Sequence, residues 1–111
     1  MATDPHAIAE RYGTPTYLYD LATVRERARA LRAALPYARA RWLYAIKANP
    51  CPAVVRCLLA EGFGVDAVSP GEIALARRCG CASTDILYTE NNASDHDLRY
   101  ALEAGVLVTC G

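Results

Sequence analysis

The sequence predicts an α/β fold built on a parallel sheet. From residue 41 onward, short apolar segments alternate with helical ones in the order βαβαβαβ, and the connections between them are short. The apolar segments are continuously hydrophobic, as VLV at 106–108 is, which is typical of strands buried on both faces. A doubly wound sheet and a (β/α)8 barrel both fit this pattern. No G-x-G-x-x-G follows the first strand, which disfavours a dinucleotide-binding sheet.

The first 40 residues predict a short helical lead-in, then a β-prone segment, then one long helix. Turn-forming residues at 13–15 lead into the aromatic segment 16–19, which predicts a short strand. Asp20 is a suitable N-cap for a helix over 21–35, because its carboxylate can accept hydrogen bonds from the first turn. Apolar residues recur along that helix at helical spacing, at Leu21, Val24, Ala28, Leu31 and Leu35.

Three helices and four strands account for the remainder of the chain. Strands are predicted over 42–46, 63–69, 85–90 and 106–109, and helices over 50–62, 70–80 and 95–105. Early prolines suit the first turns of the helices that begin at 50 and 70, and Ser94 is a candidate N-cap for the last helix. All three helices end in a glycine, which is a common helix terminator.

Composition limits the classes of function. A chain of 111 residues is long enough for one small domain, and a hydrophobic fraction of 53% indicates a globular protein. The formal net charge of zero gives no support for a nucleic acid or an acidic membrane as a partner. No apolar run approaches the roughly 18 residues of a membrane span, and the start has no apolar signal segment. A cytoplasmic protein is therefore expected.

Cysteine usage predicts free thiols and no metal site. The five cysteines, at 51, 57, 79, 81 and 110, are an odd number without a secretion signal, so a disulfide framework is not expected. Cys79 and Cys81 have a C-x-C spacing that metal sites also use. There is no second such pair, however, and the two histidines lie far away in the sequence.

Lys47 is the only lysine of the chain, because the other basic residues are all arginines. It directly follows the predicted strand 42–46, and functional side chains of parallel α/β folds gather at the carboxyl ends of strands. A deprotonated amine can attack a carbonyl and form a Schiff base, whereas a guanidinium stays charged and does not. A surface lysine near a strand end is the simpler interpretation, and the residues around Lys47 favour the functional one.

The segment YAIKAN at 44–49 resembles the pyridoxal-phosphate lysine segment of the alanine-racemase-like (β/α)8 barrels. Within that group, the chain is most similar to the diaminopimelate, ornithine and arginine decarboxylase family, and to its diaminopimelate branch above all. Residues 12–31 look like the opening of that branch, 65–80 like its second strand and helix, and 85–106 like its third unit. The resemblance implies the amino-terminal half of a barrel, with about four βα units, that binds pyridoxal 5'-phosphate.

The resemblance also implies roles for particular residues. Lys47 would hold the cofactor through a Schiff base and later exchange a proton at the substrate carbon. Asp66 and Glu72 match acidic positions near the cofactor and the lysine, and Ser69 lies between them. A purely structural interpretation is also open for Ser69 and Glu72, because Ser-Pro-x-Glu is a helix-capping pattern.

Other residues that match the family have simpler interpretations. Asn91 and Asn92 match positions at a strand end, but a polar turn before a helix explains them as well. Glu90 and Ala93 depart from the glycine and lysine that the family usually has on either side of the Asn–Asn pair. The aromatic residues Trp42, Tyr44 and Tyr88 are expected in the core rather than in a site.

The resemblance gives an expectation for the whole protein. Residues 1–111 would form a partial barrel domain, without the later strands that carry the glycine-rich phosphate loops and without the β-rich C-terminal domain. The parent enzyme would be a homodimer that decarboxylates a small amino acid, with meso-diaminopimelate as the first substrate. Ornithine, arginine, carboxynorspermidine and D-amino acids are alternatives, and a truncated, non-catalytic half barrel or pyridoxal-phosphate-binding module is an alternative of another class.

Overall fold

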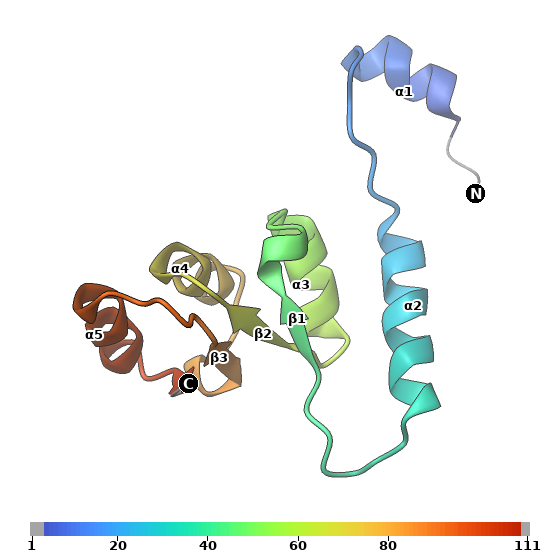
Figure 1. Cartoon of the computed structure of the whole chain (residues 1–111). Coiled ribbons are helices and arrows are strands. Elements are labelled where there is room, and N and C mark those ends of the chain that lie inside the picture. The colour runs from blue at the N-terminus through green and yellow to red at the C-terminus, as the bar shows by residue number, and fades with distance from the viewer. Residues whose placement is uncertain (1–3, 110–111) are drawn as a thin grey trace.

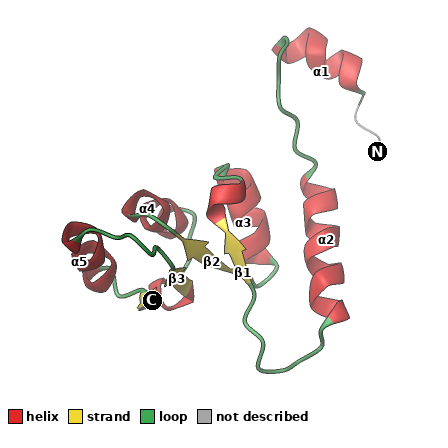
Figure 2. Ribbon diagram, viewed as in Figure 1, coloured by secondary structure: helices red, strands yellow, loops and turns green. Residues whose placement is uncertain are grey.

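The computed structural model describes residues 4–109, which contain five α-helices and four strands (Figures 1 and 2). From β1 onward, strands and helices alternate as predicted. Two short 3-10 helices, η1 and η2, lie between these elements. In chain order the elements are α1 (Pro5–Tyr12), α2 (Leu21–Ala34), β1 (Leu43–Ala45), η1 (Ile46–Ala48), α3 (Pro52–Ala60), β2 (Gly64–Ala67), α4 (Pro70–Arg78), η2 (Ser83–Asp85), β3 (Ile86–Tyr88), α5 (Asp95–Glu103) and β4 (Leu107–Val108).

The four strands form one parallel sheet whose spatial order, β1-β2-β3-β4, is the order in the chain. A doubly wound sheet reverses its strand order at a switch point. A sheet that adds each new strand on the same side, with a helix between successive strands, is the pattern of a (β/α)8 barrel. The prediction of a parallel α/β fold with part of such a barrel is confirmed.

Burial differs sharply between the two faces of the sheet. Val65, Ile86 and Tyr88 are at most 1% exposed, because they pack against apolar residues of α4 and α5. Successive side chains of a strand point to opposite faces, so the residues between them line the other face, which we call the inner face. The register places Ala45, Asp66, Leu87 and Leu107 across it. Leu107 remains 48% exposed there.

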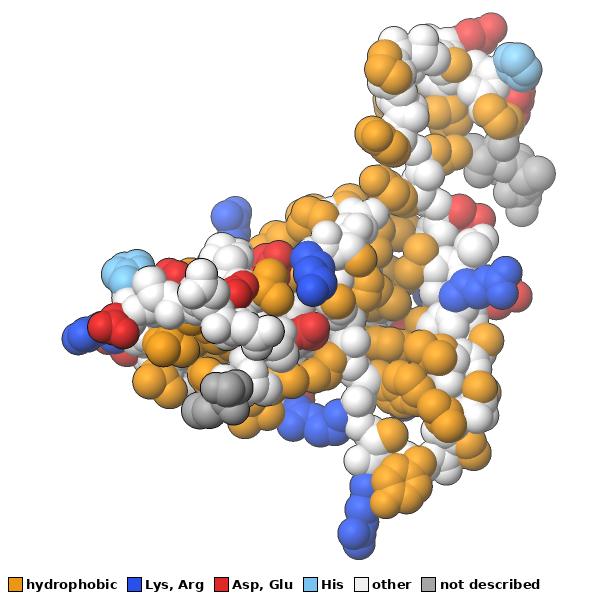
Figure 3. Space-filling view, in the orientation of Figure 1, with side chains coloured by type: hydrophobic (Ala, Val, Ile, Leu, Met, Phe, Trp, Pro, Cys, Tyr) orange, Lys and Arg blue, Asp and Glu red, His pale blue; other side chains and the backbone are white. Residues whose placement is uncertain are grey.

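A second, smaller core joins α2 to α3. Ala28 of α2 packs with Val54 and Leu58 of α3. Beside this contact lies an apolar groove of about 420 Å³, lined by residues of α2, β1 and α3. The space-filling view shows hydrophobic side chains gathered in the region between α2 and the sheet (Figure 3). Helix α1 lies apart from the sheet and buries none of its residues (Figure 1).

An ionic contact ties α2 to the end of α3. Glu61, which follows α3, accepts two hydrogen bonds from the guanidinium of Arg29, at 2.7 and 2.9 Å, and lies 3.4 Å from the guanidinium of Arg25. Arg32 donates to the backbone carbonyl of the same glutamate. The hydrogen bonds from Arg29 lower the pKa of the Glu61 carboxyl below its ordinary value.

Most helix boundaries follow the predicted signals, whereas all four sheet strands are shorter than predicted and the predicted strand 16–19 does not form. The carboxylate of Asp20 accepts hydrogen bonds from the backbone N–H groups of Ala22 and Thr23, and Ser94 caps α5. The predicted strand 16–19 is wrong, because this segment is extended but pairs with no other strand, and Tyr17 is 91% exposed. The first sheet strand is shorter than 42–46, because the backbone turns into η1 at Ile46.

Cys51, Cys57, Cys79 and Cys81 are free thiols, and Cys110 lies outside the described residues. Within residues 4–109, no group of three or more His, Cys, Asp and Glu side chains is placed to hold a metal ion. In the same range, no helix has both the length and the apolar character needed to cross a membrane.

We predict that Glu61→Gln lowers the free energy of unfolding at pH 7, because it removes the charge that Arg29 and Arg25 contact. The pKa of Glu61 is lowered in the folded chain, so the stabilisation is fully present above its ordinary value of 4.5 and is lost as the pH falls through the lowered value. Urea unfolding from pH 7 to pH 3 should therefore show the gap between the two proteins closing. Glu26→Gln, on the exposed side of α2, is the control and should change little at either pH.

We predict that Tyr88→Phe raises the free energy of unfolding by roughly 1 kcal/mol. Its hydroxyl is buried and, among the described residues, is the one buried side-chain oxygen or nitrogen without a hydrogen-bond partner. Burial, together with the charges of Asp97 and Glu90, also raises the pKa of this phenol. Urea unfolding at pH 7 measures the change, and a less stable phenylalanine variant would contradict the prediction.

Candidate functional site

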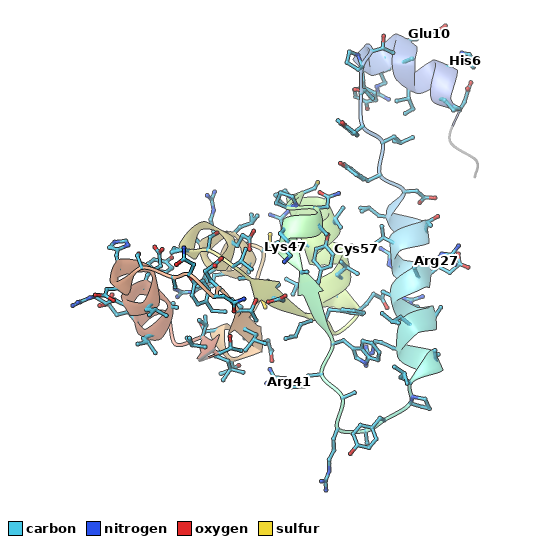
Figure 4. All side chains as sticks on the ribbon, viewed as in Figure 1. His6, Glu10, Arg27, Arg41, Lys47 and Cys57 are labelled. Atoms are coloured by element: carbon cyan, nitrogen blue, oxygen red, sulfur yellow. The ribbon has the colours of Figure 1, made fainter. Side chains whose placement is uncertain are left out.

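Lys47 lies in the tight turn η1, immediately after β1, at the carboxyl end of the sheet. Ile46 is fully buried and anchors the turn in the core, whereas the side chain of Lys47 is exposed. Figure 4 shows Lys47 at the end of β1 that is opposite to Arg41. The predicted position at the carboxyl end of the first strand is confirmed, although the lysine follows the strand through a turn and does not extend it.

Hydrogen bonds from both sides hold this turn in place. The hydroxyl of Tyr44 donates to the backbone carbonyl of Asn49 at 3.1 Å, which links a residue before the turn to one after it. The side-chain carbonyl of Asn49 accepts from the backbone N–H of Cys51 at 3.0 Å, and α3 begins at the next residue. Partial burial raises the pKa of the Tyr44 phenol, so the hydroxyl remains a donor throughout the neutral range.

Asp66 lies on the inner face of β2, in register with Ala45 of β1. It is therefore on the strand next to Lys47 and close to the same end of the sheet. The hydroxyl of Thr89, the first residue after β3, donates to its carboxylate oxygen Oδ1 at 2.6 Å. No local sequence pattern points to Thr89, because this contact joins residues 23 positions apart and depends on how β2 and β3 are aligned.

Ser69 and Glu72 both take part in the first turn of α4. The hydroxyl of Ser69 accepts from the backbone N–H of Glu72 at 3.2 Å, with Pro70 at the first helical position. The Glu72 carboxylate accepts from the backbone N–H of Val68 at 2.8 Å, one residue earlier than in an ordinary capping box. The structural interpretation of this pair is confirmed, and it places both side chains just beyond the carboxyl end of β2.

The simpler interpretations hold for the asparagines and Tyr88, whereas Trp42 lies in neither of the two cores. Asn91 and Asn92 are exposed in the turn before α5, and the backbone N–H of Asn92 donates to the Glu90 carboxylate at 2.9 Å. Tyr88 is buried in the main core, whereas Trp42 and Tyr44 are half-buried. The structure thus places Lys47, Asp66 and Glu72 on adjoining segments at the carboxyl ends of β1 and β2, in η1, in β2 and in the first turn of α4 respectively.

A family model, described as the pyridoxal binding domain of pyridoxal-dependent decarboxylases, matches residues 21–111. The chain belongs to this family. The family and the cofactor class that the resemblance implied are thereby confirmed. The match begins at the first residue of α2 and includes the whole sheet with its three helices.

Among relatives of this pyridoxal-binding domain, the diaminopimelate decarboxylase of Methanothermobacter thermautotrophicus is 46% identical over 107 residues, which are 95% of this chain and 25% of that protein. The diaminopimelate decarboxylase of Thermoplasma acidophilum is 39% identical over 91% of this chain and 25% of its own length. A crystal structure of lysine/ornithine decarboxylase from Vibrio vulnificus, complexed with putrescine, superposes with a TM-score of 0.85 at 38% identity, covering 91% of this chain and 27% of that one. The chain spans about a quarter of the length of the proteins it matches.

We predict that Tyr44→Phe lowers the free energy of unfolding by roughly 1 kcal/mol, because the Asn49 carbonyl loses its partly buried donor. Hydrogen exchange of the backbone amides at 46–49 should become faster in the same variant, since the turn loses one of its two ties. Tyr37→Phe, at a tyrosine that is 68% exposed, is the matched control and should change neither measurement. Unchanged exchange in Tyr44→Phe would show that the hydroxyl does not hold the turn.

Proposed function

We propose that this chain is the cofactor-anchoring part of a pyridoxal-phosphate-dependent amino-acid decarboxylase. The observation that carries the proposal is the position of the only lysine: Lys47 is exposed at the carboxyl end of β1, beside the strand that bears Asp66. Membership of the pyridoxal-binding family supports the cofactor, and the similarity to two diaminopimelate decarboxylases supports the reaction.

The groups at this end of the sheet suit an aldehyde cofactor. The aldehyde of pyridoxal phosphate needs a primary amine, and Lys47 supplies one on a turn whose backbone is tied on both sides. Asp66 and Glu72 place negative charge on the neighbouring strand end, which favours a cationic group there. When bound, the cofactor supplies a sink for the electron pair that remains after carbon dioxide leaves.

The proposed reaction exchanges a carboxylate for a proton. The bond between the substrate Cα and its carboxylate breaks, carbon dioxide leaves, and one proton is added to the same carbon. The Lys47 amine is the basic side chain at this edge of the sheet that can carry a proton to or from that carbon. Exposure of its side chain allows the amine to reach a substrate on the inner side of the sheet.

Meso-diaminopimelate, whose decarboxylation gives lysine, is the substrate we propose first. Two relatives, at 46% and 39% identity, are named diaminopimelate decarboxylase. Ornithine, arginine, carboxynorspermidine and D-amino acids are the alternatives. We further propose that the remaining barrel strands and a β domain belong to a longer, cytoplasmic, homodimeric enzyme. The share of about a quarter that the chain covers in its relatives supports the greater length of the enzyme.

We predict that pyridoxal phosphate followed by borohydride labels the chain at Lys47. Only this side chain and the α-amine of Met1 are primary amines in the sequence, so peptide mass spectrometry gives an almost binary result. Label at the Lys47 peptide should exceed label at the α-amine, because Lys47 stands on a turn whose backbone is tied on both sides and which adjoins the strand that bears Asp66. Lys47→Arg should abolish the first label and leave the second unchanged.

Label confined to the α-amine would overturn the proposal that Lys47 anchors the cofactor in this chain. The reaction itself is tested with amino acids that carry ¹³C in the carboxylate, added to the chain together with pyridoxal phosphate and without borohydride. Release of ¹³CO2 from meso-diaminopimelate above that from ornithine or arginine supports the first substrate. Labelling of Lys47 without release from any of them would show that this chain anchors the cofactor but does not by itself decarboxylate these amino acids.

A further inference from the structure

The hydrogen bond between Thr89 and Asp66 is the shortest side-chain contact at the carboxyl end of the sheet. The two residues come from neighbouring strand ends and both are partly buried. Their O···O distance of 2.6 Å lies in the range of a hydroxyl that donates to an ionised carboxylate. Bonds of this type are stronger and more directional than those between neutral groups.

The backbone fixes the position of the Thr89 hydroxyl. The backbone N–H of Thr89 donates to the carbonyl of Ala67 at 3.0 Å, which extends the pairing of β2 and β3 one residue beyond the strand. On the other side, the backbone N–H of Thr109 donates to the carbonyl of Tyr88 at 3.0 Å. A β-branched side chain has few rotamers, so the hydroxyl of Thr89 is a donor held at one place on the inner face.

The contact uses only one oxygen of the Asp66 carboxylate. Oδ2 makes no hydrogen bond with any residue in the described range 4–109. Asp66 of β2 is in register with Ala45 of β1, and Lys47 follows Ala45 by two residues. A carboxylate that is fixed through Oδ1 therefore offers its second oxygen to a cationic N–H group at that edge.

We propose that Thr89 is a positioning residue, which holds the carboxylate of Asp66 so that Oδ2 faces the amine of Lys47 or the cationic part of its bound cofactor. The inference rests on the proposed function, since it needs Lys47 as the reacting amine. The competing explanation is that Thr89 only joins β2 to β3, as a cross-strand pair of polar residues does. The two explanations predict different behaviour for valine and serine at this position.

The experiment compares Thr89→Val, which keeps the shape but loses the donor, with Thr89→Ser, which keeps the donor. Each 111-residue chain is treated with pyridoxal phosphate and borohydride, and the label at Lys47 is divided by the label at the α-amine of the same molecules. Thr89→Val should lower this ratio about tenfold, and Thr89→Ser should keep it within about twofold of the unchanged chain. Thr84→Val, at an exposed threonine in η2, is the matched control and should leave it unchanged.

Asp66→Asn tests whether Thr89 acts through the carboxylate. If it does, adding Thr89→Val to Asp66→Asn should lower the ratio no further, because both changes remove the same arrangement. Fully additive effects would overturn the proposal. So would a Thr89→Val ratio equal to that of the unchanged chain, or a ratio that falls only in proportion to a loss of circular dichroism. If the unchanged chain carries no label at Lys47, the proposed function fails, and the inference fails with it.

Discussion

One-sided burial of the sheet is the constraint on which the rest of this structure depends. Val65, Ile86 and Tyr88 are nearly inaccessible because the helices α4 and α5 cover their face. Alternation along a strand then commits Asp66 and Leu87 to the inner face. A shift of β2 by one residue would bring the Asp66 carboxylate into the apolar core, where an unpaired charge is very costly. The packing of the helices therefore decides where the acidic group of the candidate site lies.

Much of this architecture was predictable, because its signals are local. The N-caps Asp20, Ser69 and Ser94 each bond to backbone N–H groups within their own helix, so a few consecutive residues are enough to locate the start of each helix. The alternation of apolar and helical segments likewise indicates a parallel sheet. Lys47 was found by its rarity and by its place after an apolar run, and neither observation needs coordinates.

What escaped prediction depends on contacts between distant segments. Thr89 reaches Asp66 only because β2 and β3 align in one particular register, which no local pattern specifies. The segment 16–19 has the residues of a strand, but a strand also needs a neighbour with which to exchange backbone hydrogen bonds, and none lies beside it in the described chain. The turn at Ile46–Ala48 was hidden for a similar reason, because the buried Ile46 continues the apolar pattern past the strand end.

The two ends of the sheet are held together by different means. At the amino end, Arg41 donates to the Thr84 carbonyl and the Asp85 carboxylate, both at 2.7 Å, and so ties the approach to β1 to the approach to β3. At the other end, Lys47 and Thr89 follow β1 and β3, and Asp66 lies in β2 close to its carboxyl end. Substitutions in the loops beyond the carboxyl ends of the strands can therefore change ligand specificity during evolution. The hydrogen bonds of Arg41 at the opposite end of the sheet continue to stabilise the fold. Fold and specificity are free to diverge at separate rates.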